Sequence, residues 1–231
     1  MKTNKPGTHK RVIAYLIDLI IITLLSGILT VVIIDNTKYE EKENELVELL
    51  TKFTNKEITQ EEYLETYDNL NYELTKESVG VTVITCVMSL VYYVVLCYYC
   101  KGVTLGKYFM KIRIVSNNGK KLTILNYFLR SLVINMILSH ALTILLIKVL
   151  SKSQFISVYT YVQNALSILI LASLLLIMYR NDGRGIEDFM GNTKVINFKD
   201  EELEKEEVKE EVKDAVIVEE KKRGRNKKEV K

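Results

Sequence analysis

Residues 11–34 read RVIAYLIDLIIITLLSGILTVVII, and this stretch decides the fold class. Its length suits a helix that crosses a membrane, because about 20 apolar residues span the hydrocarbon layer. Arg11 stands at its start, and Asp18 lies inside it, seven residues later. At about 100° per residue the two side chains share one face of a helix, about 10 Å apart along its axis. Since a carboxylate that faces lipid costs about 3 kcal/mol, we expect Asp18 to point into a bundle of protein helices.

Three more apolar runs follow, separated by strongly charged blocks. Of the 231 residues, 48% are hydrophobic and 26% are charged, and the two classes hardly mix. Such segregation is typical of a polytopic membrane protein and not of a soluble domain. We therefore predict an all-α integral membrane protein whose membrane domain covers residues 10–198. Its four transmembrane helices are expected at about residues 12–34, 79–100, 124–147 and 155–179.

The charged connectors predict the orientation of these spans. Residues 101–121 carry six basic residues and no acidic one, whereas residues 35–78 carry thirteen acidic residues against five lysines. Because short cytoplasmic loops are enriched in lysine and arginine, we expect the 101–121 loop and both termini in the cytoplasm. The chain is thus predicted to be a multi-pass protein of the cytoplasmic membrane, with the lipid bilayer as its first partner.

Several features outside or at the ends of the spans have a predictable structure. Residues 35–78 contain leucines and tyrosines at helical spacing, which predicts an acidic helical hairpin on the outer side. Residues 111–115 and 194–198 are short alternating stretches, and we expect them to pair as β-strands beneath the membrane. Residues 199–231 are rich in glutamate and lysine, so a disordered cytoplasmic tail is expected. Four tyrosines crowd the end of the second span, as aromatic belts do: Tyr92, Tyr93, Tyr98 and Tyr99.

The sequence lacks the patterns that catalysis, metal binding or cofactor binding require. Residues 104–107, TLGK, do not have the Walker spacing of a phosphate loop. Cys97 and Cys100 lie in an apolar run without a second ligand pair, so we expect free thiols. The net charge of +3 hides large opposite local charges and gives no reason to expect nucleic acid. We therefore expect no enzyme activity, no catalytic residue, no metal, no cofactor and no nucleic-acid partner.

Several short motifs, taken together and in order, resemble those of the RDD family of bacterial membrane proteins, which is named for one arginine and two aspartates. Arg11 and Asp18 match the arginine and the first aspartate. Residues 102–115, GVTLGKYFMKIRIV, resemble the family's loop after the second span. Arg130 matches the arginine that opens the next span.

The closing motif of the family resembles residues 185–188, GIED, and makes Asp188 the second aspartate. Glu187 stands where the family usually has histidine, which departs from the pattern. The resemblance covers residues 10–198 apart from the 35–78 connector, and it implies a membrane protein suspected of moving an ion or small solute. The cytoplasmic motif positions are Thr104, Gly106, Lys107, Gly191 and Thr193.

The charged residues of the membrane domain are the candidate functional site. They are Arg11, Asp18, Arg130 and Asp188. We expect the arginines at the cytoplasmic ends of the first and third spans to hold the Asp18 carboxylate away from lipid. This set either fixes how the four helices pack or lets Asp18 bind a cation or proton during transport. Polar neighbours for a pathway or for helix packing are Asn135, His140, Gln163 and Asn164.

Two classes of function stay open. The resemblance and the buried charges favour transport of an ion or small solute. Because four spans are few for a transporter, a homo-oligomer is expected to enclose the path. The alternative is a non-transporting scaffold or accessory protein that recruits partners through its cytoplasmic face and its tail. That alternative predicts that removing residues 200–231 matters more than altering Asp18.

Overall fold

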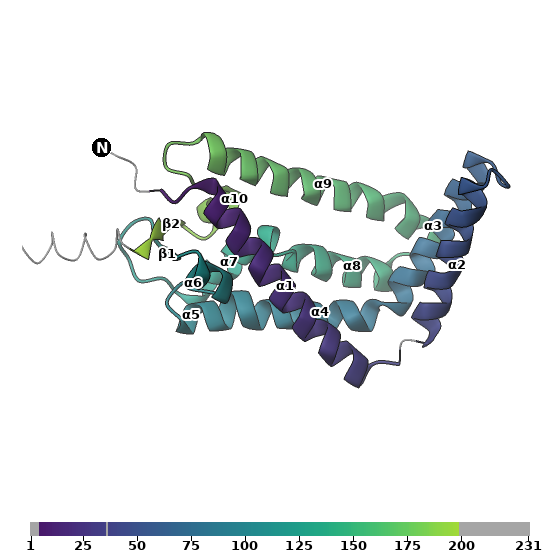
Figure 1. Ribbon diagram of the computed structural model, residues 1–231, viewed down its shortest axis with the longest axis horizontal. Helices are drawn as coiled ribbons and strands as arrows, with labels where there is room; N and C mark the ends of the chain where they lie inside the picture. The colour runs from purple at the N-terminus through teal and green to yellow at the C-terminus, as the bar shows by residue number, and fades with distance from the viewer. Residues whose placement is uncertain (1–4, 36, 199–231) are drawn as a thin grey trace, which may run out of the picture.

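The structure, a computed structural model, describes residues 5–35 and 37–198. It is an elongated bundle of helices with a two-stranded sheet at one end and a helical hairpin at the other (Figure 1). We call the end with the sheet, residues 102–116 and 185–197, the motif end, and the opposite end the hairpin end. The predicted tail at 199–231 lies outside the described residues.

Among residues 5–35 and 37–198, three helical segments are long and apolar enough to cross a membrane. The first is α1 (Thr8–Ile33), and the last is α9 (Lys152–Tyr179). The second segment, Val79–Tyr99, is continuous but changes its winding. It consists of α4 (Val79–Leu90), the π-helix η1 (Val91–Leu96) and α5 (Cys97–Tyr99). All three segments lie where the hydropathy pattern predicts spans.

The predicted third span, residues 124–147, is broken in the structure. It consists of two helices, α7 (Ile124–Ile134) and α8 (Ile137–Val149), that are bent by 70° relative to each other. Met136, between them, has φ 56° and lies in the left-handed region, which ends a right-handed helix. The described residues therefore hold three candidate spans, or four if the bent pair is counted as one.

The hairpin end is formed by α2 (Thr37–Thr54) and α3 (Gln60–Glu77), where a helical pair is predicted. The start of α3 is fixed by a capping box: Glu62 N–H donates to Thr59 Oγ1 at 3.2 Å, and Thr59 N–H donates to Glu62 Oε2 at 3.0 Å. The rings of Phe53 and Tyr63 stack with centroids 4.5 Å apart and hold the two helices together. Figure 1 shows this pair lying across the end of the bundle.

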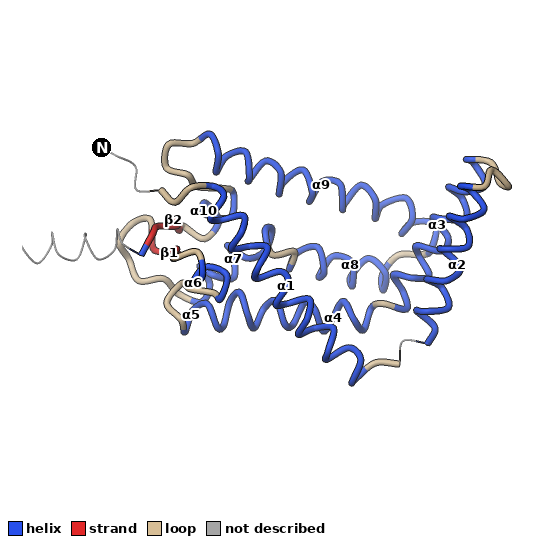
Figure 2. The backbone as a smooth tube through the Cα atoms, in the orientation of Figure 1, coloured by secondary structure: helices blue, strands red, loops and turns tan. Residues whose placement is uncertain are grey.

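The motif end contains two short helices and the predicted strand pair. The strands β1 (Ile112–Ser116) and β2 (Thr193–Asn197) lie side by side (Figure 2). They pair antiparallel, with Ile112 opposite Asn197 and Ser116 opposite Thr193. The strand prediction is confirmed, with each strand shifted by one residue: β1 begins and ends one residue later than predicted, and β2 one residue earlier. The short helices are α6 (Leu105–Phe109) and α10 (Ile186–Met190). Alternate strand residues, among them Ile112, Ile114 and Val195, point into the core.

One narrow face of α1 is buried along its whole length. Its residues recur every fourth position, as one face of a helix requires: Ala14, Asp18, Ile22, Ser26 and Thr30. On this face α6 approaches so closely that a Cβ atom at Gly106 would overlap the carbonyl oxygen of Ala14. Glycine at position 106 therefore allows α1 and α6 to pack backbone against backbone.

Candidate functional site

The carboxylate of Asp18 is fully buried, with 0% of the residue exposed. Its Oδ1 accepts hydrogen bonds from the Tyr92 hydroxyl at 2.6 Å and from Gly106 N–H at 2.7 Å. Its Oδ2 accepts one from Thr104 Oγ1 at 2.5 Å and lies 3.6 Å from Lys107 Nζ. Three hydrogen bonds and one ion pair therefore surround the carboxylate. We call these five residues the Asp18 site.

Local sequence explains why the Asp18 site forms at the start of α6. Thr104 precedes the helix, and the first N–H groups of a helix have no partner within it. The Tyr92 hydroxyl accepts Leu105 N–H at 3.1 Å, and Asp18 accepts the next N–H group, from Gly106. Lys107 Nζ also donates to Thr104 Oγ1 at 3.0 Å, which holds its ammonium group beside the carboxylate.

Asp188 is the second fully buried carboxylate, with 0% exposed. Its Oδ2 accepts Arg11 Nη2 at 2.6 Å, and its Oδ1 accepts Arg130 Nη1. Thr193 Oγ1 also donates to Oδ1, at 3.1 Å. Gly185 N–H donates to Oδ2 at 3.2 Å, so the same carboxylate caps the start of α10. Asp188 thus joins the first turn of α1, α7, α10 and β2.

Glu187 is also buried, with 2% exposed. Its Oε1 accepts Arg11 Nη2 at 2.9 Å, and its Oε2 accepts the Ser173 hydroxyl of α9. Ser173 Oγ in turn accepts Ile186 N–H at 2.9 Å, which ties α9 to α10. Two guanidinium groups therefore face two carboxylates, and the charges balance. We call the four residues Arg11, Arg130, Glu187 and Asp188 the Asp188 cluster.

The expectation that arginines hold Asp18 is wrong. Arg11 and Arg130 make their ion pairs with the acidic residues of α10, and in the described part of the chain Lys107 is the cation beside Asp18. The predicted network of four charges is therefore two separate groups. The expectation that Asp18 points into the bundle agrees with its complete burial.

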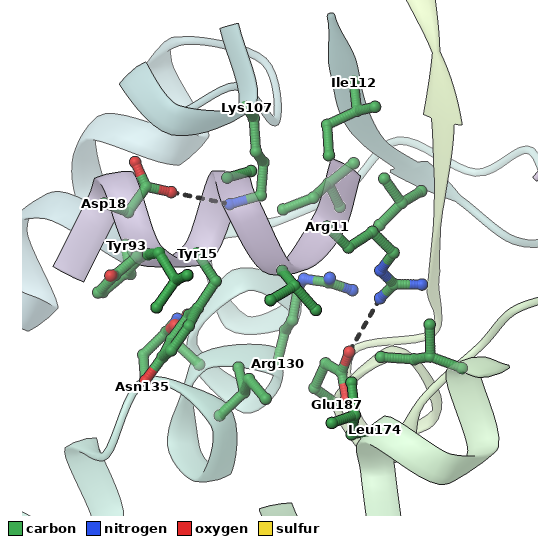
Figure 3. A pocket seen from close by; sticks show the side chains of 18 of the residues that line it. Arg11, Tyr15, Asp18, Tyr93, Lys107, Ile112, Arg130, Asn135, Leu174 and Glu187 are labelled. Carbon is green, nitrogen blue, oxygen red and sulfur yellow. Dashed lines mark hydrogen bonds and ion pairs between the residues drawn. The ribbon is translucent and has the colours of Figure 1, made fainter. Parts of the chain in front are cut away.

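Both groups border one cavity of about 300 Å³ between α1, α7, α9 and the sheet (Figure 3). Asp18 and Lys107 line one part of it, and Arg11, Arg130 and Glu187 line another. Figure 3 shows the Arg130 side chain reaching among the lining side chains. The rest of the wall is mainly apolar, with residues such as Val12, Leu16, Ile134, Ile170, Leu174 and Ile177.

Four of the five predicted motif positions make hydrogen bonds or ion pairs in these groups, and the fifth, Gly191, packs beside the Cβ atom of Arg130. Thr104, Gly106 and Lys107 belong to the Asp18 site, and Thr193 Oγ1 accepts Arg130 Nη1 at 2.7 Å. Gly191 lies against α7, where an added Cβ atom would be 2.7 Å from the carbonyl oxygen of Asn126.

The four predicted polar neighbours have different surroundings. Asn135 lines the cavity at the bend between α7 and α8. Gln163 joins α8 to α9, because Ser139 Oγ donates to its Oε1 at 2.8 Å and its Nε2 donates to Thr143 Oγ1 at 3.1 Å. His140 is half-buried on α8, and Asn164 is exposed on α9. The structure therefore brings Asn135 alone of these four to the cavity wall.

Tyr92 and Tyr93 contribute to the site, which corrects their assignment to an aromatic belt. They are 6% and 5% exposed, and both lie in η1. A π-helix contains more residues per turn than an α-helix, and here three consecutive residues, Tyr92, Tyr93 and Val94, are buried. The burial of adjacent tyrosines opposite a buried aspartate has no signature in hydropathy alone.

The Asp188 carboxylate stays charged over the ordinary pH range. Burial raises its pKa, but the guanidinium groups of Arg130 and Arg11 outweigh burial and lower the pKa to about 2, from an ordinary value of 3.8. A carboxyl group with a lowered pKa stabilises the folded state above its unfolded pKa, and this stabilisation is lost as the pH falls through the folded pKa.

Acid unfolding should show this shift. We expect the stability that depends on Asp188 to be constant from pH 8 to about pH 4 and to fall between about pH 4 and pH 2. Thermal unfolding of the purified protein across this range, compared with Asp188→Asn, measures the difference. A loss of stability centred between pH 5 and pH 7 that disappears in Asp188→Asn would contradict the assignment.

Comparison with known proteins agrees with these features. The model of the RDD family matches residues 5–192, which include both buried aspartates and both arginines of the Asp188 cluster. Searches of curated proteins and of solved structures found no match. The match and the apolar helices together make this chain a membrane protein. The chain belongs to the RDD family.

Proposed function

We propose that the protein takes part in moving an ion or small solute across the cytoplasmic membrane, and that the cavity at the motif end is the site where this ion or solute binds. The observation that carries this proposal is the cavity of about 300 Å³, whose wall includes members of both charged groups. A mainly apolar wall with a few charged and polar groups is typical of a site that binds a small molecule. Ionisable residues inside a membrane domain commonly mark a substrate or ion pathway.

The energetics of the Asp188 cluster support a role beyond packing. Replacing a buried ion pair by apolar residues of similar volume is often neutral or stabilising. Four buried charges are therefore a poor means of holding helices together. An arrangement in which ion pairs exchange partners provides the two states that alternating access requires.

The proposal includes a homo-oligomer with the motif end in the cytoplasm. Lys107 and Arg113 belong to the basic connector that predicts this orientation. Asn164 supports the oligomer, because its side chain is exposed near the middle of α9. An amide in hydrocarbon favours a hydrogen bond across a helix interface, and the same amide of a second copy supplies both a donor and an acceptor.

A flux screen with a cavity-filling variant tests the proposal. Purified protein in vesicles is challenged with gradients of sodium, potassium, chloride, a short carboxylate and a short ammonium compound, with Asp18→Asn included. Leu174 lines the cavity, so we expect Leu174→Trp to reduce the flux at least about tenfold by occupying the binding space. Its neighbour Leu175 is 45% exposed on the outer face of α9, and Leu175→Trp should leave the flux within about twofold of wild type.

Two results would contradict transport. One is the absence of flux above that of empty vesicles for every gradient. The other is an equal effect of Leu174→Trp and Leu175→Trp in variants that remain folded by size-exclusion chromatography. In the first case the scaffold alternative, with recruitment through residues 199–231, becomes the better account.

A further inference from the structure

Every oxygen of the carboxylates that line the cavity already accepts at least one hydrogen bond. Asp18 Oδ1 accepts two hydrogen bonds, and Oδ2 accepts one and lies 3.6 Å from the Lys107 ammonium group. Glu187 accepts Arg11 on one oxygen and Ser173 on the other. A cation that approaches these carboxylates meets a positive charge already in place, the Lys107 ammonium group beside Asp18 and the Arg11 guanidinium group beside Glu187. The acidic groups of the wall are therefore already paired with cationic side chains in this structure.

The cavity also contains hydrogen-bond donors that have no partner among the described residues. Arg130 makes both of its hydrogen bonds, to Asp188 and to Thr193, through Nη1. Within residues 5–35 and 37–198, its Nε and Nη2 have no hydrogen-bond partner, although a guanidinium group carries five N–H donors. The hydroxyl of Tyr93 is buried and also has no partner among these residues. Both residues line the cavity.

Donors at a guanidinium edge select a particular kind of group. The Nε and Nη2 atoms of an arginine match the two oxygens of a carboxylate in a bidentate pair. The nearby charges of Arg11, Arg130, Glu187 and Asp188 balance, so a single negative charge fits better than a phosphate dianion. The remaining wall is apolar and suits a hydrocarbon body.

We propose that the cavity binds a small monocarboxylate with an apolar body, its carboxylate on the Nε–Nη2 edge of Arg130 and its body against α1 and α9. This inference rests on the proposed function, since it names the class of solute that the cavity takes. The volume of about 300 Å³ matches a short chain or a single ring. Free short acids are therefore the expected ligands, and long acyl chains from the membrane are not.

Binding of matched six-carbon probes to the protein in nanodiscs tests the class. Hexanoate, hexan-1-ol and hexylammonium share a body and differ in the head group. We expect hexanoate to bind at least about tenfold more tightly than hexan-1-ol, because a charge-assisted pair with arginine exceeds a neutral hydrogen bond, and hexylammonium to bind least. Binding is measured by calorimetry at pH 7.

Two variants locate the binding within the cavity. Leu174→Trp should abolish binding of hexanoate, whereas Leu175→Trp should leave its Kd unchanged. Arg130→Lys keeps the charge but removes the guanidinium edge, so the preference for hexanoate over hexan-1-ol should fall to a few-fold. That ratio compares two ligands on one protein, so it is insensitive to a general loss of stability.

The contrary outcomes are distinct from a failure of the proposed function. If hexylammonium binds more tightly than hexanoate, the carboxylate class is wrong and the proposal of transport is unaffected. If the affinity keeps rising from hexanoate through decanoate to hexadecanoate, the inference of a short ligand is wrong, and the cavity binds a long-chain acid from the membrane. If no probe binds while the flux screen is positive, the inference is wrong and the proposed function survives. If the flux screen is also negative, both are wrong.

Discussion

Asp188→Ala is expected to lower the free energy of unfolding by about 3–5 kcal/mol, because it leaves buried guanidinium charge without its partner. In the described residues Arg130 makes its ion pair with Asp188 alone, whereas Arg11 also has Glu187. The loss should therefore centre on α7 and β2, which Arg130 connects through Asp188 and Thr193. Unfolding of the purified protein by a denaturing detergent measures the change.

Asp182→Ala is the matched control for this prediction. Asp182 also pairs with an arginine at the motif end, with Arg180 Nη2 at 2.9 Å. That pair is exposed, and exposed ion pairs contribute little to stability. We expect no measurable change in the free energy of unfolding for Asp182→Ala. Equal effects of the two substitutions would contradict the prediction that the buried guanidinium groups depend on the Asp188 carboxylate.

Gly106→Ala is expected to destabilise the protein by about 3 kcal/mol or more. The added Cβ atom would overlap the carbonyl oxygen of Ala14 and lie 2.9 Å from Asp18 Oδ1. Backbone atoms cannot rotate away, so α6 must move from α1, which adds the cost of overpacking to the loss of a hydrogen bond to a buried charge. The apparent melting temperature and the free energy of unfolding should both fall.

Gly27→Ala applies the same substitution to α1 as a control. No atom lies within 4 Å of a Cβ atom built at Gly27. Alanine is favoured over glycine in a helix by about 0.5–1 kcal/mol, so this variant should be as stable as the wild type or slightly more stable. If Gly106→Ala is equally well tolerated, the backbone contact between α1 and α6 is not required.

Much of the architecture is predictable because membrane solvation acts on each helix separately. Apolar length alone locates α1, the second segment and α9, and alternation locates β1 and β2. The burial of Asp18 follows in the same way from the cost of a carboxylate in lipid. These are properties of single segments, so they are visible in the sequence.

The pairing of charges is different, because it depends on how segments meet. Arg11 and Asp18 share a face of α1, but about 10 Å along the axis separates them. That spacing allows Arg11 and Asp18 to reach different partners. Asp188 reaches Arg11 only when α10 folds against the bundle, and Lys107 reaches Asp18 only when α6 does. The same holds for the inward position of Tyr92, which depends on the π-helix η1.

The bend between α7 and α8 has a consequence for the surrounding lipid. The thirteen residues of α8 extend about 20 Å, which is shorter than a hydrocarbon layer of about 30 Å. Because α7 turns away by 70°, it adds little to that length. Hydrophobic mismatch on this side of the protein favours local thinning of the bilayer. Vesicles made from shorter-chain lipids should therefore accommodate the protein with less deformation than thick, sterol-rich ones.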